Sequence, residues 1–158
     1  MLEVLLAGLI FGADQLIKHR IDRAPESSLD RPLAGGRFIV TRFHNEGALL
    51  GFLKEQKSLL DMLSGAAAAG LAVSLLKAVS GRAPLLKRIS LSLAAGGAAS
   101  NMYDRALHGR VTDYFRITFL GRRLKNVIFN IGDIAIITGA FLETAGQIMS
   151  LIRQDKKC

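Results

Sequence analysis

An acidic residue inside an apolar run is the first sign of chemistry in this chain. The segment VIFNIGDIAIITGAF, residues 127–141, carries Asn130 and Asp133 three positions apart. In an α-helix this spacing puts both side chains on one face. A carboxylate in such a run is costly to bury unless a specific partner compensates it. Asp133 is therefore a candidate functional residue.

A second acid, Asp113, lies in the segment GRVTDYF that leads towards this run. Two carboxylates held close together do not both ionise easily, so they share one proton. Such a pair can activate a water with one carboxylate and protonate a leaving amine with the other. Spacing alone leaves two alternatives open, a proton relay and ion pairing of Asp133 with Arg105 or Arg110.

Other reactive residue types give weaker signals. The histidines, His19, His44 and His108, are scattered, and the single cysteine, Cys158, is the last residue. No H-E-x-x-H pattern is present, so we expect no metal site, and with neither a P-loop nor a G-x-G-x-x-G pattern we expect no cofactor. Ser100 lacks the G-x-S-x-G setting of a serine nucleophile.

The polar candidates need elements to position them, and composition indicates which. Half of the 158 residues are hydrophobic, and the formal net charge is +8. Mean hydropathy is +0.31. Apolar residues occur in long blocks with the charges between them, which favours a multi-pass membrane protein over a nucleic-acid-binding protein. The length predicts one domain, residues 1–158.

Four apolar blocks predict an all-α membrane protein with four transmembrane helices, since a span needs about 20 residues. Their approximate bounds are 2–19, 58–79, 84–104 and 127–152. Small-residue runs in the second and third blocks, SGAAAAG and AAGGAAS, predict close helix packing.

The loops between the blocks predict strands and a topology. β-branched and aromatic residues in about 36–53 and 108–125 predict a small extracytoplasmic β-cradle. Four spans put both termini on one side of the membrane. The turn between spans two and three lies on the same side as the termini. It is compact and basic, which indicates that this side is the cytoplasm. Its basic residues are Lys77, Arg82, Lys87 and Arg88.

The remaining polar residues of the blocks have structural and functional interpretations. Asp14 and Lys18 are four residues apart and predict a structural ion pair on one helix face. Asp104 beside Arg105 has the same interpretation. Glu143 lies deeper in the fourth block. With Asp14 and Asp133 it supports an alternative function, a small proton-coupled membrane transporter.

Four segments in order carry a resemblance to a known family: DQLIK (14–18), HNEGALLGF (44–52), GGAASNMYDRALHGRVTDYF (96–115) and FNIGD (129–133). Through them the chain resembles the lipoprotein signal peptidases, the type II signal peptidases of bacteria. The third segment is the most specific, because it holds the Asn-x-x-Asp-Arg and Val-x-Asp-x-Phe elements at family spacing.

The resemblance implies an aspartic endopeptidase of the bacterial cytoplasmic (inner) membrane, with cytoplasmic termini. It would be a monomer that uses no cofactor and binds no nucleic acid. Its partners would be membrane lipid and diacylglyceryl-modified prolipoproteins, whose signal peptide it would cleave before the modified cysteine.

The family motifs also imply site residues. The catalytic pair falls on Asp113 and Asp133. Substrate-binding or site-orienting positions fall on Asn45, Gly47, Asn101, Arg105 and Asn130. Supporting positions fall on Asp14, Lys18 and Asp104.

Six positions depart from the usual family pattern: Ile17, Leu49, Leu50, Ser100, Gly132 and Ile134. They bear on the acyl-chain and cradle contacts, so the resemblance does not determine substrate preference or inhibitor binding. A catalytically silent paralogue that holds lipoproteins without cutting them is a further alternative. Retention of both aspartates argues against it.

Overall fold

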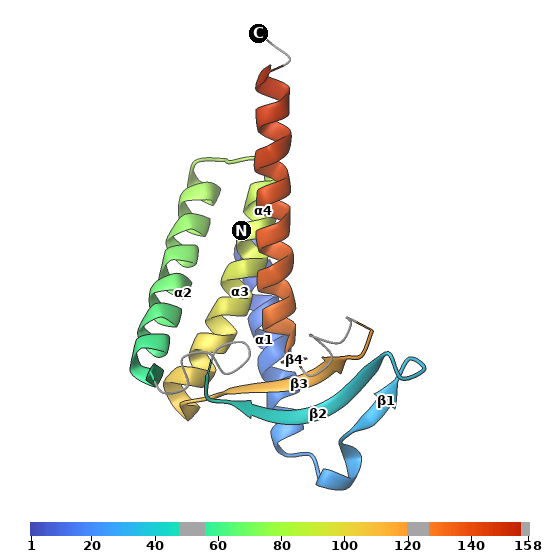
Figure 1. The fold of residues 1–158 in the computed structure, drawn as a ribbon. Coiled ribbons are helices and arrows are strands. Elements are labelled where there is room, and N and C mark those ends of the chain that lie inside the picture. The colour runs from blue at the N-terminus through green and yellow to red at the C-terminus, as the bar shows by residue number, and fades with distance from the viewer. Residues whose placement is uncertain (48–55, 120–126, 156–158) are drawn as a thin grey trace.

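The computed structural model describes residues 1–47, 56–119 and 127–155. Four long helices form a bundle, and a small antiparallel sheet lies across one end of it (Figure 1). The helices are α1 (Leu2–Asp22), α2 (Lys57–Ser80), α3 (Leu85–His108) and α4 (Ile131–Asp155). The strands follow the order β1 (Arg31–Leu33), β2 (Phe38–Asn45), β3 (Val111–Ile117) and β4 (Ile128–Phe129).

Helix α3 occupies the centre of the bundle because its small residues admit its neighbours closely. A β-carbon at Gly96 would lie 2.5 Å from the carbonyl oxygen of Ala7 on α1. A β-carbon at Gly97 would overlap the carbonyl oxygen of Gly132 on α4. Small residues commonly allow such backbone contact between membrane helices. The close packing predicted for AAGGAAS is therefore confirmed.

The small-residue run of α2 behaves differently. A β-carbon at Gly65 would meet only the Met102 side chain, at 3.5 Å, and one at Gly70 would meet no atom within 4 Å among the described residues. Most of this run faces outward. In Figure 1, α2 stands at the side of the bundle beside α3.

The distribution of polarity is inverted relative to a water-soluble protein. The largest fully buried side chains are all polar: Asn130, Asp14, Ser90, Ser92 and Ser100. Large apolar side chains lie exposed on the outer faces, such as Leu9 at 70% and Phe141 at 71%. Lipid around the helices explains this pattern, because polar groups must then find partners inside. Within the described residues, α2 and residues 131–154 of α4 are long and apolar enough to span a membrane.

Several predicted boundaries need correction. Helix α1 continues to Asp22, three residues beyond the prediction, and α3 continues to His108 rather than 104. Arg42 of β2 donates hydrogen bonds to carbonyl groups at the end of α1, including that of Asp22 at 3.0 Å, which stabilises the added turn. Helix α3 stops where Gly109 adopts a left-handed conformation, φ 66°.

The start of the fourth helix also differs from the prediction of 127. Residues 128–129 form β4, which pairs with β3, and the helix begins at Ile131. Strands β2 and β3 lie within the predicted cradle segments, whereas β1 and β4 were not predicted. Residues 48–53 and 120–125 of the predicted cradle lie outside the described residues, as do Leu49 and Leu50.

Candidate active site

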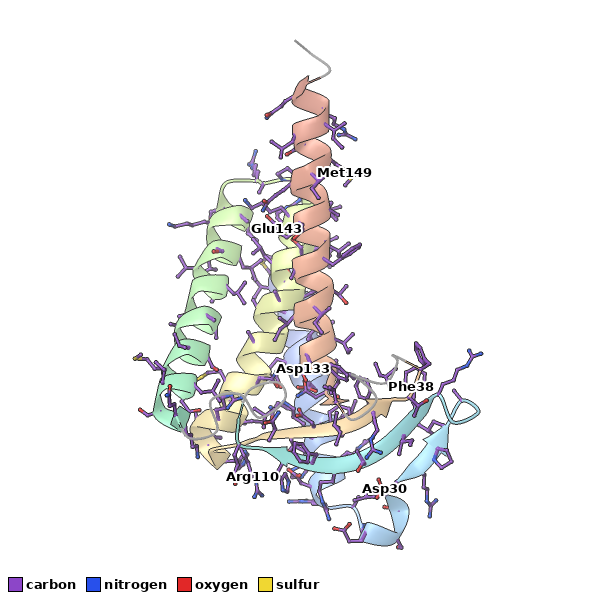
Figure 2. All side chains as sticks on the ribbon, viewed as in Figure 1. Asp30, Phe38, Arg110, Asp133, Glu143 and Met149 are labelled. Carbon is purple, nitrogen blue, oxygen red and sulfur yellow. The ribbon has the colours of Figure 1, made fainter. Side chains whose placement is uncertain are left out.

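Asp113 and Asp133 meet where the sheet joins the bundle, and Asn130 connects them. Strand β3 carries Asp113, and the first turn of α4 carries Asp133. The Asn130 side chain donates a hydrogen bond to Asp113 Oδ1 at 2.7 Å. Its backbone N–H donates to Asp133 Oδ2 at 3.1 Å. Asn130 therefore holds both carboxylates at one site, and their role as a catalytic pair stays a prediction. Figure 2 shows Asp133 at this end of α4.

The three-residue spacing of Asn130 and Asp133 has a structural origin other than a shared helix face. Asn130 precedes the helix, so the two residues do not share a helix face as predicted. The Asp133 N–H donates to Asn130 Oδ1 at 2.8 Å, while the Asp133 carboxylate accepts from the Asn130 N–H. These reciprocal bonds form a capping box, which satisfies two otherwise free donors at the helix start. An Asn-x-x-Asp pattern before an apolar run was the available signal.

Strand β2 supplies the second amide that contacts Asp113. Asn45 Nδ2 donates to Asp113 Oδ2 at 3.0 Å, and Asn45 Oδ1 accepts from the Gly47 N–H at 3.0 Å. The register of β2 against β3 shifts between Val40 and Phe43. Such bulges re-aim the side chains that follow them. Asn45 therefore lies beside Asp113, and Gly47 contacts the same Asn45 side chain.

Asn101 links Asp133 to a buried lysine. Asn101 Nδ2 donates to Asp133 Oδ1 at 2.8 Å, and Asn101 Oδ1 accepts from Lys18 Nζ at 2.9 Å and from Asn130 Nδ2 at 3.1 Å. All the polar atoms of this amide are therefore used in positioning the site. The orientation of the amide is set because its oxygen accepts a hydrogen bond from a cation and its nitrogen donates one to a carboxylate.

Lys18 lies between two buried carboxylates. Its Nζ atom is 2.8 Å from Asp14 Oδ2 and 2.9 Å from Asp104 Oδ2. The predicted Asp14–Lys18 pair is confirmed. Asp104 pairs with Lys18 and not with its neighbour Arg105, which corrects the second predicted pair. Removing one partner from such a buried group leaves an uncompensated charge, at a cost of about 3–5 kcal/mol.

Ser100 and Tyr114 complete this buried network. Ser100 Oγ donates to Asp14 Oδ2 at 2.6 Å and accepts from Lys18 Nζ at 3.3 Å. The departure at Ser100 therefore adds a hydrogen-bonded group to the network. Tyr114 Oη donates to Asp14 Oδ1 and accepts from the Ile131 N–H, both at 2.8 Å. No sequence signal distinguished Tyr114 from an ordinary aromatic strand residue.

The departure at Gly132 also has a physical explanation. A β-carbon there would lie 3.0 Å from both Asn130 Oδ1 and Asp14 Oδ2. Glycine therefore leaves room for two oxygens of the network, and it lets α4 touch α3 at Gly97. Ile134 packs against the apolar cluster of Ile117, Val127 and Phe129. For Ile17 the structure offers no comparable explanation.

Arg105 connects the site to α2. Its Nη2 atom donates to the Gly47 carbonyl oxygen at 2.9 Å, and its Nη1 atom lies 3.7 Å from Asp61 Oδ1. Arg105 thus holds Gly47, two residues after β2, against the bundle. The alternative of an ion pair between Arg105 and Asp133 is not what the structure has, since the Asp133 oxygens accept from Asn101 and Asn130.

The electrostatics of the pair favour one retained proton. Burial, followed by the charge of Asp133, raises the pKa of Asp113 from 3.8 to about 7. Hydrogen bonds from Asn45 and Asn130 act in the opposite direction. Burial and the nearby Asp14 raise the pKa of Tyr114, so this phenol remains a donor. A protonated and an ionised carboxyl can therefore coexist at neutral pH.

The carboxylates of the transporter hypothesis are not gathered in one place. Glu143 accepts hydrogen bonds from Ser90 at 2.8 Å and Gln147 at 3.1 Å. It lies ten residues along α4 from Asp133, which is about 15 Å. In Figure 2 Glu143 lies well up α4 from Asp133. Among residues 1–47, 56–119 and 127–155, no His, Cys, Asp and Glu side chains form a metal-binding group.

Known proteins resemble this chain over most of its length. A family model described as signal peptidase (SPase) II matches residues 6–149. The lipoprotein signal peptidase of Brevibacillus brevis is 30% identical, covering 85% of this chain and 87% of that protein. The enzyme of the same name from Bacillus subtilis is 30% identical, covering 90% of both.

Solved structures share the fold. A bacterial membrane enzyme determined at 2.3 Å superposes with a TM-score of 0.78 at 22% identity, over 98% of this chain and 90% of that one. A second, determined at 1.9 Å, gives a TM-score of 0.76 over 92% of this chain and 91% of that one. From the family match and these relatives, the chain is a membrane protein that belongs to the signal peptidase II family.

Proposed function

We propose that this protein is an aspartic endopeptidase that removes the signal peptide of prolipoproteins before a diacylglyceryl-modified cysteine. The observation that carries the proposal is that Asn130 donates hydrogen bonds to both Asp113 and Asp133. Family membership supports a protease, and the two carboxylates supply its chemistry. A substrate with two acyl chains is confined to the bilayer surface, so its scissile bond lies at the depth of the site.

The two carboxyl groups have different roles in the proposed reaction. Asp133 lies in the first turn of α4, where the helix N-terminus favours a negative charge, and it is the base. It takes a proton from water as the water oxygen bonds to the scissile carbonyl carbon. Asp113 carries the other proton and gives it to the amide nitrogen as the carbon–nitrogen bond breaks. Transfer of the proton on Asp133 to Asp113 restores the starting state.

We also propose that all four helices span the bacterial inner membrane as a single-domain monomer with cytoplasmic termini. The shortest, α1, has 21 residues, which gives about 32 Å at 1.5 Å per residue. This length is sufficient for the hydrocarbon core of about 30 Å. The sheet and the candidate active site would then lie on the outer side.

The test is cleavage of a diacylglyceryl-modified prolipoprotein by the purified protein in detergent. The parent is compared with Asp113→Asn and Asp133→Asn, and with Glu143→Gln as a matched carboxylate control on α4. Cleavage before the modified cysteine by the parent and the Glu143 variant alone supports both the reaction and the pair. Parent-like rates in either site variant would remove that residue from the catalytic pair.

Failure of the folded parent to cleave has two distinguishable meanings. Binding of the lipidated substrate without cleavage would support the silent lipoprotein-binding paralogue. Loss of a proton-coupled activity in the Glu143 variant, without peptide cleavage by the parent, would support the transporter.

A further inference from the structure

The end of the bundle opposite the sheet contains a groove between α3 and α4. Its volume is about 660 Å³, within the range of small-molecule sites of about 300–1,000 Å³. Leu86, Leu142 and Met149 contribute apolar surface to it, and charged side chains occupy the same lining, namely Lys87, Glu143 and Arg153. In Figure 2 Glu143 and Met149 mark this part of α4, far from Asp133.

The depth of the groove matches the second boundary of a membrane. Arg153 is 20 residues beyond Asp133 on α4, which is about 30 Å at 1.5 Å per residue. This distance equals the thickness of a typical hydrocarbon core. If Asp133 lies near one surface, Lys87 and Arg153 lie near the other. Exposed apolar side chains continue along this part of α4, at Ile148, Leu151 and Ile152.

The charges of the groove favour an anion. Glu143 accepts hydrogen bonds from Ser90 and Gln147, so protein donors already serve its carboxylate. Lys87 Nζ is 4.0 Å from Glu143, and the Lys87 side chain remains 52% exposed. Two cations face one carboxylate, which leaves a net positive lining. A phosphodiester has the complementary charge, and cations near a membrane surface attract anionic lipids.

We propose that this groove binds one anionic phospholipid of the leaflet opposite the candidate active site. Lys87 and Arg153 contact the headgroup phosphate, and an acyl chain lies along Leu86, Leu142 and Met149. The lipid is a resident of the fold and not a substrate, because the groove is about 15–30 Å along α4 from Asp133. The proposal does not depend on the peptidase reaction.

The experiment measures apparent dissociation constants for phosphatidylglycerol by native mass spectrometry of the full chain released from detergent micelles. The double variant Lys87→Gln/Arg153→Gln removes the two groove cations. Lys77→Gln/Arg82→Gln removes two cations at the same end of the bundle but outside the groove. We expect about 30-fold weaker binding in the groove variant, since each cation contributes about 1 kcal/mol, and no change in the control. Equal weakening in both variants would mean a diffuse surface effect and would overturn the site.

A second variant keeps every charge. A β-carbon at Gly146 would lie 3.1 Å from Leu86 Cδ2, so Gly146→Leu fills the groove against the flexible end of that side chain. We expect this variant to lose phosphatidylglycerol binding while Lys87 and Arg153 remain. Parent-like binding in this variant, or equal affinity of the parent for phosphatidylcholine, would contradict the proposal.

Discussion

Helices α2 and α3 have the same length, 24 residues, but opposite surroundings. Helix α3 buries nine residues, most of them small or polar, whereas α2 buries three. Yet α2 is the helix apolar enough to be a candidate span by composition, and α3 is not. In lipid an apolar side chain gains little from the protein interior, while a polar group must find a partner there. Polarity, and not hydrophobicity, therefore marks the helix that organises the bundle.

The largest effect that we expect from this contrast concerns Lys18, which packs on α3. Lys18→Met leaves Asp14 and Asp104 buried without their cation, and we expect a loss of about 3–5 kcal/mol in the free energy of unfolding. Lys77→Met on the exposed end of α2 should change it by less than about 0.5 kcal/mol. Unfolding in mixed micelles measures both. If both variants lose the same free energy of unfolding, the buried charges packed against α3 matter no more than the exposed end of α2.

The next effect concerns the glycines. Gly97→Ala forces α3 and α4 apart at the Gly132 carbonyl, and we expect a loss of about 3 kcal/mol. Gly70→Ala on α2 meets open space and should be neutral or stabilising by up to about 1 kcal/mol. The same unfolding measurement decides. An Ala at position 97 that costs no more than an Ala at position 70 would show that the backbone contact is unimportant.

Ser100→Ala is expected to have a smaller effect. It removes the hydroxyl that donates to Asp14, and hydrogen bonds to charged groups are worth about 1.5–3 kcal/mol. We expect about 1.5 kcal/mol, because Lys18 and Tyr114 still serve Asp14. The matched control is Ser74→Ala, on the exposed face of α2. No difference between the two serine variants would contradict a role for Ser100 in the network.

The smallest effect at neutral pH concerns protonation of Asp113. The proposed reaction needs its proton, and its pKa is about 7, so the cleavage rate should fall by about half near pH 7 and continue to fall above it. The hydrogen bond from Asn45 lowers the pKa of Asp113, so Asn45→Ala should move the midpoint of this fall to higher pH. Ser74→Ala should leave it in place. If Asn45→Ala leaves the midpoint unchanged, the pH dependence of cleavage does not come from protonation of Asp113.

The same contrast explains how far the sequence predicts this molecule. Four long helices, strands in both loops and the convergence of Asp113 with Asp133 follow from residue patterns and from the family motifs. Asp104 shows where pattern fails, because its partner Lys18 lies 86 positions away by residue number, while the adjacent Arg105 reaches Gly47 instead. Spacing predicts a pair along one helix, such as Asp14 with Lys18, whereas the pair of Lys18 with Asp104 depends on how α1 packs against α3.

Asn130 and Tyr114 illustrate two kinds of missed information. The spacing of Asn130 and Asp133 fits a helix cap, but the apolar run predicts a helix that begins earlier. Strand β4, only two residues long, occupies part of the extra turn that the run predicted. Tyr114 carried no signal, because its contacts with Asp14 and Ile131 depend on the tertiary arrangement of α1, β3 and α4.

The contact between Gly97 and Gly132 has a consequence for the membrane around the protein. A bilayer thicker or thinner than the helices is accommodated by tilt. The backbones of α3 and α4 touch here and again where Gly139 meets the carbonyl oxygen of Ser90, so the two helices should tilt together as one unit. The Asn101–Asp133 hydrogen bond joins these two helices beside the first contact, so changes in lipid chain length should leave that bond unchanged.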